Sequence, residues 1–595
     1  MSRPTLLLAT ILLWGCSDSG PKPASSVDEF LTMYNELDRR LYTVAAEAQW
    51  KAVTDVTEEH TGARIGADRA LAAFRGSRYV IDSSRRFLDL RESLNDLKFR
   101  ELDKILLNAA ESPGTIPDVV QARIEAEARL TAAMDGFTFC LERRGEQCLK
   151  PITANEIDDI LLNSRNLAER RKVWEASKQI GPPLKAGLAE VRDLRNRTAT
   201  ELGYSSFFHL QVADYGMSVS ELMQLMDKVV LETQPLYRQL DLYARRKLAE
   251  RYGQPVPERL PAHWLPNRWG QEWPGLAGTV DFNGLFKRKE PKWIVEQAER
   301  FYTSLGFPAL PRQFWEKSDL YQLPPDATRR KNTHASAWHI DRNQDVRSLM
   351  SVVPNFRWFE TSHHELGHVY YYLAYSNPKV PIVLREGANR AFHEAVGDLI
   401  GAAARQELYL RQLGLLPASQ TIDRTQWLLN EALDSAVVFL PWSAGVMTHF
   451  EHDLYERKLP AEQFNRRWWE LVTKYQGFVP PSERGEQFCD ACTKSHLIDD
   501  PAQYFDYAVA TLLKYQLHDY ISRRILKQDP RRCNYYGNKE VGRWLWEILS
   551  LGATRDWRQV LREKTGEDLS SRAMIEYFRP LSEYLEKEDA SAGKN

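Results

Sequence analysis

The sequence has few cysteines, no long apolar run and no excess of either charge. Six cysteines among 595 residues are too few for a fold built on disulfides. The 79 lysines and arginines against 81 aspartates and glutamates give a formal net charge of −2. This net charge does not indicate binding to nucleic acid. No apolar run reaches the roughly 18 residues that a membrane-spanning helix needs. A content of 43% hydrophobic and 27% charged residues also excludes wholesale disorder.

Helical periodicity dominates the chain, whereas strand-like alternation is scarce and internal repeats are absent. Ser26 and Glu29 fit a capping box, and apolar residues then recur at spacings of four and three from Phe30 onward, as on one face of a helix. We therefore predict a mainly α fold in one large domain that spans residues 27–588. The small polar residues that end the chain predict a frayed tail over 589–595.

The amino-terminal segment is typical of an export signal. A positive charge precedes a short apolar stretch, Leu6–Trp14, and the string that ends in Cys16 resembles a bacterial lipobox. We predict a signal peptide over 1–15, a lipidated Cys16 and a polar tether over 16–26. The protein would then be exported from a bacterial cell and anchored as a lipoprotein, periplasmic or on the outer surface. The alternative is a plain secretory signal with an incidental cysteine, which would leave the protein secreted or periplasmic.

The cysteines downstream of the signal suggest local bridges, because export permits disulfides. Cys140 and Cys148 bracket a short loop that a bridge could close. Cys489 and Cys492 form a C-x-x-C, a spacing found in redox and zinc motifs, but no second such pair completes a zinc site. We expect either a local bridge between these two residues or a bridge from one of them to Cys533.

The strongest chemical signal is the string His-Glu-Leu-Gly-His at residues 364–368. Histidines four apart on a helix lie about 40° from each other around the axis, so His364 and His368 can share one ion. Glu365 can then reach the water that the ion activates. Zinc lowers the pKa of such a water towards about 7 and polarises a carbonyl, while a carboxylate accepts the proton. The plain alternative is a solvated helix face with two incidental histidines.

A catalytic zinc needs a third protein ligand, and a second helical segment offers one. Glu394 can be that ligand, and Asp398, one turn later, can accept an N–H from a ligand histidine. His393 is a rival ligand by residue type. Adjacent residues of a helix cannot share one face, so either His393 or Glu394 must point away. A purely structural zinc site would typically need a fourth protein ligand, and only three well-placed ones occur here.

These segments resemble the signature of the angiotensin-converting-enzyme-type peptidyl-dipeptidases. The matching strings are His363–His368, Leu384–Asn389 and Phe392–Asp398. The resemblance implies a large, two-lobed helical fold around a deep substrate channel. It also implies one zinc ion held by His364, His368 and Glu394, with Glu365 as the general base.

Four further segments extend the resemblance along the chain: Trp269–Trp273, His334–Trp338, Lys494–His496 and Tyr504–Tyr507. The residues that it implies for substrate binding are Gln271, His334, Ala335, Lys494 and Tyr504. A C-terminal carboxylate needs a cation and neutral donors, and Lys494 with Gln271 and Tyr504 would supply them. By the same resemblance His496 and Tyr507 would face the reacting carbonyl, where donors stabilise an oxyanion. Taken singly, each residue would ordinarily be assigned to the surface or to packing.

The sequence departs from the family pattern at several positions. Val472 and Asp506 stand where chloride-activated members of the family carry arginines. An apolar group and an acid cannot hold chloride, so we predict that activity does not depend on this anion. Arg385–Glu386 and Arg390–Ala391 also differ from the family pattern near the zinc motif, and we expect them to alter side-chain preference.

We therefore predict a zinc peptidyl-dipeptidase that releases dipeptides from oligopeptides with a free C-terminal carboxylate. A zinc monocarboxypeptidase is the nearest alternative, because relatives with that activity carry an arginine at the position of Gln271. The other alternative is a lipoprotein that binds peptides without catalysis. The sequence sets no oligomeric state, and its only predicted route to a membrane is the lipidated Cys16.

Overall fold

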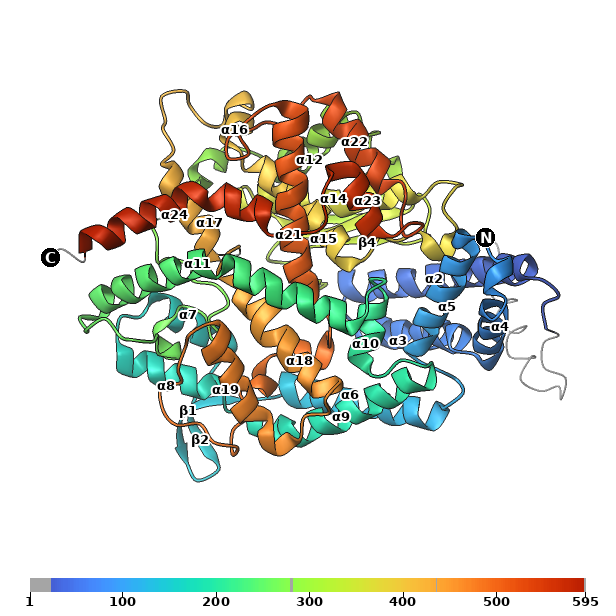
Figure 1. The fold of residues 1–595 in the computed structure, drawn as a ribbon, viewed down its shortest axis with the longest axis horizontal. Coiled ribbons are helices and arrows are strands. Elements are labelled where there is room, and N and C mark those ends of the chain that lie inside the picture. The colour runs from blue at the N-terminus through green and yellow to red at the C-terminus, as the bar shows by residue number, and fades with distance from the viewer. Residues whose placement is uncertain (1–22, 279–281, 435, 593–595) are drawn as a thin grey trace.

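The computed structural model describes residues 23–278, 282–434 and 436–592, which form a mainly α-helical body (Figure 1). This confirms the predicted fold class. The predicted signal peptide, 1–15, and Cys16 lie outside the described residues and stay predictions. Across the described ranges, no helix combines the length and the apolar character that crossing a membrane would require.

Four amino-terminal helices, on the right of the view in Figure 1, pack around a small core to which Val380, Val383 and Leu384 also contribute. They are α2 (Val27–Thr54), α3 (Glu58–Arg75), α4 (Arg78–Leu88) and α5 (Asp96–Ala110). Phe30 and Tyr34 of α2 are fully buried against Val80 of α4 and Leu102 of α5. The predicted apolar face of the first helix therefore forms its packing surface.

The predicted capping box at the start of α2 forms only in part. Ser26 is the N-cap, and its Oγ accepts the backbone N–H of Glu29 at 3.2 Å. The carboxylate of Glu29 bonds to the N–H and hydroxyl of Ser25 instead of reaching Ser26. The helix therefore begins where predicted, but the reciprocal bond is made one residue earlier.

The remaining helices form the rest of the body, most of them around one continuous core. In chain order they are α6 (Pro117–Asp135), α7 (Ala154–Asn163), α8 (Leu167–Ser177), α9 (Gly181–Glu201), α10 (Phe207–Ala213), α11 (Val219–Tyr252), α12 (Pro291–Leu305), α13 (Arg312–Lys317), α14 (Phe356–Tyr375), α15 (Arg390–Ala404), α16 (Glu407–Gln412), α17 (Arg424–Asp434), α18 (Thr448–Tyr455), α19 (Phe464–Tyr475), α20 (His496–Asp499), α21 (Phe505–Tyr520), α22 (Lys539–Leu549), α23 (Trp557–Thr565) and α24 (Arg572–Ala592). In Figure 1, α8, α9, α18 and α19 lie in the lower half and α12, α16 and α22 in the upper half. The long helix α11 crosses the middle between the two groups, and α21 runs from the upper group down towards it (Figure 1).

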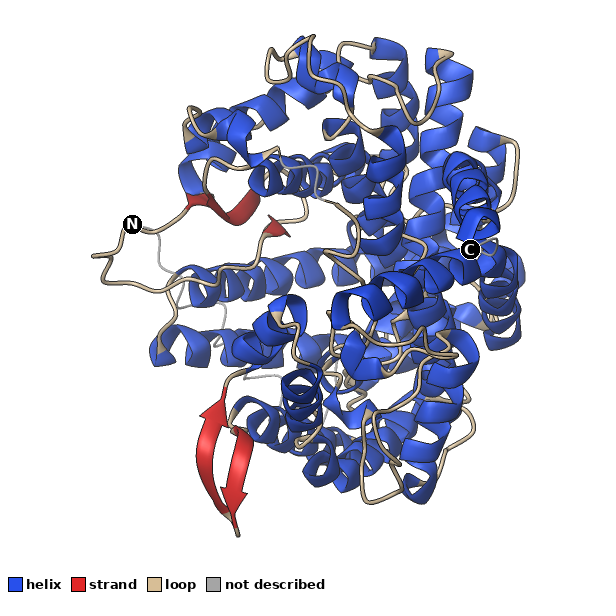
Figure 2. Ribbon diagram, turned by 90° about the vertical axis from the view of Figure 1, so that its left-hand side faces the viewer, coloured by secondary structure: helices blue, strands red, loops and turns tan. Residues whose placement is uncertain are grey.

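Two small sheets complete the described fold. β1 (Phe139–Arg144) and β2 (Gln147–Ile152) pair antiparallel in a hairpin that projects from the helical body (Figure 2). A disulfide joins Cys140 to Cys148 across it, as predicted. In the second sheet β5 (Val346–Val352) is central, with β3 (Asp319–Tyr321) parallel on one side and β4 (Ser336–His339) antiparallel on the other. β4 is therefore an edge strand.

Helices α14 and α15 carry the zinc-type motifs and pack against each other at close range. Asn355 caps α14 and Asn389 caps α15, each accepting a backbone N–H from the first turn. At the crossing point, a Cβ added to Gly367 would lie 3.0 Å from the Cα of Gly397. The absence of side chains at these two positions lets the helices approach closely enough to bring their functional residues together.

The carboxyl-terminal end differs from the sequence prediction. We expected residues 589–595 to fray, but α24 continues to Ala592. The side chain of Asp589 accepts a hydrogen bond from Arg246 on α11, which ties the last turns of α24 to the body. The predicted tail is therefore helical over residues 589–592, and residues 593–595 lie outside the described part of the chain.

Candidate active site

His364, His368 and Glu394 bring three potential metal-binding atoms together. The Nε2 atoms of His364 and His368, one turn apart on α14, lie 3.0 Å from each other. Oε2 of Glu394 on α15 lies 3.8 Å from Nε2 of His364 and 3.9 Å from that of His368. Zinc–ligand bonds of about 2.0–2.2 Å place tetrahedral ligand atoms roughly 3.3 Å apart, so these donors fit a zinc ion with one position open. The predicted ligand set is thus assembled in space.

The second ring nitrogen of each histidine also has a partner. Nδ1 of His364 lies 3.1 Å from Oδ1 of Asp398, as predicted for a supporting carboxylate. Nδ1 of His368 lies 2.7 Å from Nδ1 of His393. His393 is therefore not part of the ligand cluster, which Glu394 completes. Its contact with His368 was missed by sequence reasoning, although ligand histidines usually have such a partner on the second nitrogen.

Glu365 faces the same cavity as the metal-binding cluster. This cavity of about 510 Å³ is lined by His364, Glu365, His368 and Glu394, and on another side by the β4 edge. The side chain of Glu365 is almost completely buried, and this burial raises its carboxyl pKa to about 7. A carboxylate with a pKa near neutrality is well suited to accept and return a proton.

The segment that includes His334 and Ala335 forms another wall of the cavity. His334 is exposed, and its Nδ1 lies 2.8 Å from the carbonyl oxygen of Ala335. Ser336 and Ala337 follow on β4, which pairs on one side only, with β5. An edge strand beside a cavity can pair with an extended peptide through main-chain hydrogen bonds.

Gln271, Lys494 and Tyr504 also lie close together. Lys494 Nζ donates to Oε1 of Gln271 at 2.8 Å and lies 5.5 Å from the centre of the Tyr504 ring. The same Nζ is 4.5 Å from the ring of Trp269. Burial of Lys494 lowers the pKa of its ammonium to about 8. The site therefore presents a buried cation, an amide and a phenol, which together suit a carboxylate.

Glu272 lies next to this group and was missed by sequence reasoning. Its Oε1 accepts a hydrogen bond from Nε2 of Gln271 at 3.2 Å and one from Asn267 at 3.3 Å. The amide of Gln271 is therefore oriented with its N–H towards Glu272 and its oxygen towards Lys494. Sequence reasoning did not predict an acidic side chain next to residues that would bind the substrate carboxylate. The motif specifies Gln271 and allows any residue at position 272.

His496 and Tyr507 form an aromatic cluster with Tyr504. The ring centres of His496 and Tyr507 are 6.2 Å apart, and Tyr504 lies 5.1 Å from His496 and 5.0 Å from Tyr507. Burial lowers the pKa of His496 to about 4, so this imidazole is neutral at neutral pH and can donate from one nitrogen. Burial raises the pKa of Tyr507, which keeps its hydroxyl a donor.

The two positions at which the sequence departs from chloride-activated relatives are both buried. Val472 packs within the hydrophobic core on α19. Oδ1 of Asp506 accepts a hydrogen bond from the hydroxyl of Tyr215 at 2.7 Å. Burial raises the carboxyl pKa of Asp506 to about 7.

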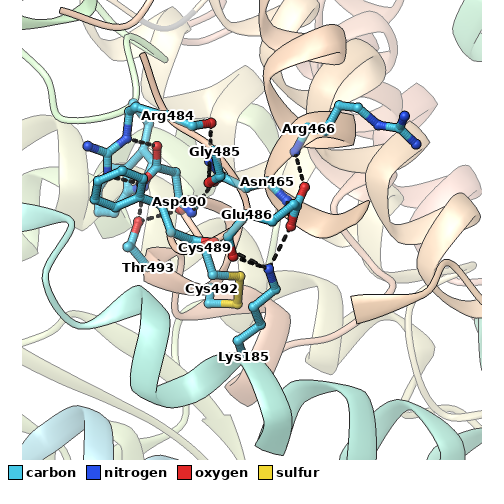
Figure 3. The surroundings of a disulfide bond; sticks show 12 residues. Lys185, Asn465, Arg466, Arg484, Gly485, Glu486, Cys489, Asp490, Cys492 and Thr493 are labelled. Carbon is cyan, nitrogen blue, oxygen red and sulfur yellow. Dashed lines mark hydrogen bonds and ion pairs between the residues drawn. A yellow bond between two sulfur atoms is a disulfide. The ribbon is translucent and has the colours of Figure 1, made fainter. Parts of the chain in front are cut away.

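A second disulfide lies directly before Lys494. Cys489 and Cys492 are joined, and Cys533 is buried and free, so the alternative bridge to Cys533 is wrong. Inside this short loop the carboxylate of Asp490 is held by the guanidinium of Arg484, with both groups buried (Figure 3). The disulfide and this ion pair thus fix the backbone that leads to the lysine.

The same segment is tied to two neighbouring helices. Lys185 on α9 donates to the backbone oxygen and the carboxylate of Glu486, at 2.7 and 2.6 Å (Figure 3). The carboxylate of Glu486 also accepts the backbone N–H groups of Asn465 and Arg466 at the start of α19 (Figure 3). These contacts hold the segment 484–494, which ends at Lys494, against α9 and α19.

Comparison with known proteins gives matches along the whole described chain. A family model described as angiotensin-converting enzyme matches residues 22–595. The chain is 30% identical to the angiotensin-converting enzyme of Theromyzon tessulatum, over 95% of this chain and 92% of that protein. It is 29% identical to the angiotensin-converting enzyme-related protein of Drosophila melanogaster, over 99% of this chain and 96% of that protein. The angiotensin-converting enzyme of Rattus norvegicus is 27% identical over 96% of this chain, which spans only 44% of that longer protein.

Proposed function

Because this chain belongs to the angiotensin-converting enzyme family of zinc metallopeptidases, we propose that it releases dipeptides from the carboxyl terminus of oligopeptides. The observation that carries the proposal is the convergence of His364, His368 and Glu394 in one cavity with Glu365. A metal-binding cluster with an adjacent buried carboxylate is the arrangement that water-dependent hydrolysis of a peptide bond requires.

The residues of the cavity and Tyr507 divide the chemistry between them. Zinc bound by His364, His368 and Glu394 would supply the positive charge that polarises the peptide carbonyl and acidifies water. Glu365 takes the proton from the attacking water and returns it to the leaving amine, because its pKa lies near neutrality. The hydroxyl of Tyr507 donates to the oxyanion that develops on the carbonyl oxygen.

His496 supports the same step from beside Tyr507. It is neutral at neutral pH, so it acts as a hydrogen-bond donor to the oxyanion rather than as a fixed cation. The cluster with Tyr504 holds both rings by aromatic contact. A donor that is positioned before the reaction stabilises the transition state without further reorganisation.

The substrate is anchored by its terminal carboxylate. Lys494 would pair with that carboxylate, and Gln271 and Tyr504 would donate to its second oxygen. Because Lys494 is 5% exposed, this pairing takes place with little solvent screening. Backbone pairing with Ala335 and with the β4 edge that follows it, together with contact with His334, would align the chain across the cavity.

The decisive experiment is product analysis on a tetrapeptide with a blocked amino terminus. The proposed function predicts free dipeptide as the first product, and addition of a chelator should abolish its release. Release of single carboxyl-terminal residues would instead establish a monocarboxypeptidase. Gln271→Arg tests the same distinction from the enzyme side, because a bulky cation would shorten the pocket and favour removal of one residue.

The non-catalytic alternative is tested by Glu365→Gln. This change preserves shape and leaves the three metal-binding residues intact, so zinc content should stay at one ion per chain. Turnover should fall by about 10²–10⁴, because the proton acceptor is lost. A rate equal to that of the wild type would remove Glu365 from the mechanism, and peptide binding without turnover in the wild type would favour a binding protein.

We also propose that activity is independent of chloride. Val472 offers no charge, and Asp506 places a buried carboxyl where an anion would have to bind. Turnover should therefore stay within about twofold when chloride replaces acetate at constant ionic strength, because no cation at these two positions is free to bind the ion. A steep increase with chloride would contradict this proposal.

Localisation forms a separate proposal that rests on the amino-terminal sequence. We propose export from a bacterial cell and anchoring through a lipidated Cys16, with the catalytic domain over residues 27–588 outside the cytoplasm. Labelling with a radioactive fatty acid should mark the wild-type protein and fail to mark Cys16→Ala. Equal labelling of both, or a cytoplasmic wild-type protein, would contradict it.

A further inference from the structure

Arg390 connects the metal-binding helix α15 with the segment that leads into α21. It is the first residue of α15, the helix that carries Glu394, and it lines the same cavity. Its Nη1 and Nη2 bind the two carboxylate oxygens of Asp500 at 2.6 and 2.7 Å. Nη1 also donates to the side-chain oxygen of Gln503 at 2.9 Å. A bidentate pair of this kind fixes both distance and orientation.

The next residue adds a second connection between the same two helices. The backbone N–H of Ala391 donates to the hydroxyl of Tyr215 at 2.9 Å, and that hydroxyl donates to Oδ1 of Asp506 at 2.7 Å. Nε of Arg390 lies 3.6 Å from Oδ2 of the same carboxylate, which is buried and has no hydrogen-bond partner. Both oxygens of Asp506, in the first turn of α21, are therefore held in relation to residues 390–391.

These contacts surround Tyr507. Tyr507 follows Asp506 in the chain, and the guanidinium carbon of Arg390 lies 5.9 Å from the centre of its ring, within cation–π range. Asp500 and Asp506 both face this cation. Without Arg390, Asp500 would lose its bidentate partner on α15 and the buried Asp506 would keep only the hydroxyl of Tyr215, so the start of α21 would be free to shift.

We propose that Arg390 is a positioning residue for Tyr507. By joining Asp500 and Asp506 to the first turn of α15, it holds the tyrosine hydroxyl at a fixed place relative to Glu394. The inference rests on the proposed function only for the role of Tyr507 in turnover. Small displacements matter here, because a donor about 1 Å out of place can cost about 10²-fold in rate.

Kinetics on a blocked tetrapeptide test the proposal with zinc-loaded protein. Arg390→Met should lower kcat by about 10–100-fold and change KM by less than about threefold, because the carboxylate site is untouched. Tyr507→Phe should lower kcat by about 10²–10³-fold. The double variant should match Tyr507→Phe within about threefold, because Arg390 acts through the hydroxyl that is already gone. Arg390→Lys should recover part of kcat, since it keeps the charge and loses the bidentate geometry.

Two further variants provide a second test of the same ion pair and a control. Asp500→Asn removes the bidentate partner and should lower kcat in the same way as Arg390→Met, so the test survives if the latter fails to fold. Arg555, just before α23, forms an exposed bidentate pair with Glu563 of that helix at 2.9 and 2.6 Å, and Arg555→Met should leave kcat unchanged. The proposal would be overturned if kcat were unchanged in both Arg390→Met and Asp500→Asn. It would also be overturned if the kcat loss of the double variant equalled the product of the losses in Arg390→Met and Tyr507→Phe.

Crystal structures of the wild type and Arg390→Met separate this inference from the proposed function, because they need no turnover. A displaced Tyr507 ring relative to Glu394 in the variant supports the positioning role even if neither protein cleaves the peptide. A Tyr507 ring in the same place in both structures overturns it. A wild type that binds zinc and leaves the blocked peptide intact would overturn the proposed function alone.

Discussion

Oδ1 of Asp398 lies 3.1 Å from Nδ1 of His364, on the side of the imidazole opposite Glu394. The contact orients the ring, because an N–H that donates to a carboxylate fixes both the tautomer and the rotation of the side chain. A ligand that is held in this way loses less freedom when a metal ion binds. Metal affinity should therefore depend on a residue that does not touch the ion.

Asp398→Asn tests this dependence. The amide cannot match the charge of the carboxylate, so zinc affinity should fall by about 10–100-fold. Competition with a chelator of known affinity measures the change directly. Asp118→Asn, at an exposed position on α6, should leave zinc affinity as in the wild type. An Asp398→Asn protein with unchanged zinc affinity would show that the ring is held by packing alone.

The pKa of Lys494 predicts an alkaline limit to activity. Burial lowers this pKa to about 8, so the free enzyme loses the cation as pH rises through that value. Because the cation pairs with the substrate carboxylate, kcat/KM should fall above about pH 8, while kcat at saturating substrate falls less. Lys494→Arg should shift the alkaline limb upward, since arginine stays protonated. The same limb in wild type and Lys494→Arg would assign it to another group.

Glu451 predicts how stability changes with pH. The side chain is fully buried on α18, and its Oε1 accepts the backbone N–H of Ala502 at 2.6 Å. Burial raises its pKa to about 8, so the folded state holds a proton that the unfolded state releases above about pH 4.5. This group makes the folded state lose stability as pH rises from about 4.5 to about 8, by up to about 1.4 kcal/mol per pH unit.

Glu451→Gln should therefore flatten that decline, because glutamine carries no charge in either state. Chemical unfolding at several pH values between 5 and 8.5 measures the effect as a difference between the two proteins. Glu462→Gln, at an exposed position, should leave the curve unchanged. Parallel curves for wild type and Glu451→Gln would contradict the assignment.

The disulfide between Cys489 and Cys492 predicts a local effect on substrate binding. Replacing both with serine frees the backbone next to Lys494, so KM should rise more than kcat falls. The loss of a bridge that closes so small a loop should lower the free energy of unfolding by about 2 kcal/mol.

The matched control removes the other bridge. Cys140 and Cys148 join the strands of the projecting hairpin, and replacing both with serine should lower stability and leave KM unchanged. An equal change of KM in both double variants would argue against a specific role for the bridge near Lys494. Peptide kinetics and chemical unfolding on the same samples measure both effects.

The metal-binding cluster could be predicted from sequence because its geometry is local. His364 and His368 share a helix face through a spacing of four, and Glu394 follows in the next long helix. The contacts that the cluster makes between α14 and α15 could not be predicted in the same way. The contact between His368 and His393 depends on how α14 and α15 cross, which spacing along the chain does not specify.

Long-range pairs account for what sequence reasoning missed or placed wrongly. The interaction of Arg390 with Asp500 joins residues 110 positions apart, and no sequence pattern in either segment predicts it. The pairing of Asp589 with Arg246 likewise extends order into a tail that looked frayed. The cysteines show the same limit, because composition left open whether Cys533 takes part in a bridge.

The close crossing of α14 and α15 also bears on mutational tolerance. A Cβ on Gly397 would lie 2.9 Å from Cε1 of His364 and 3.0 Å from both ring nitrogens. Even alanine at this position would push against a metal-binding ring whose Nδ1 is held by Asp398. In a library that varies every position and selects for peptide cleavage, Gly397 should therefore be as invariant as the histidines themselves, although it carries no chemistry of its own.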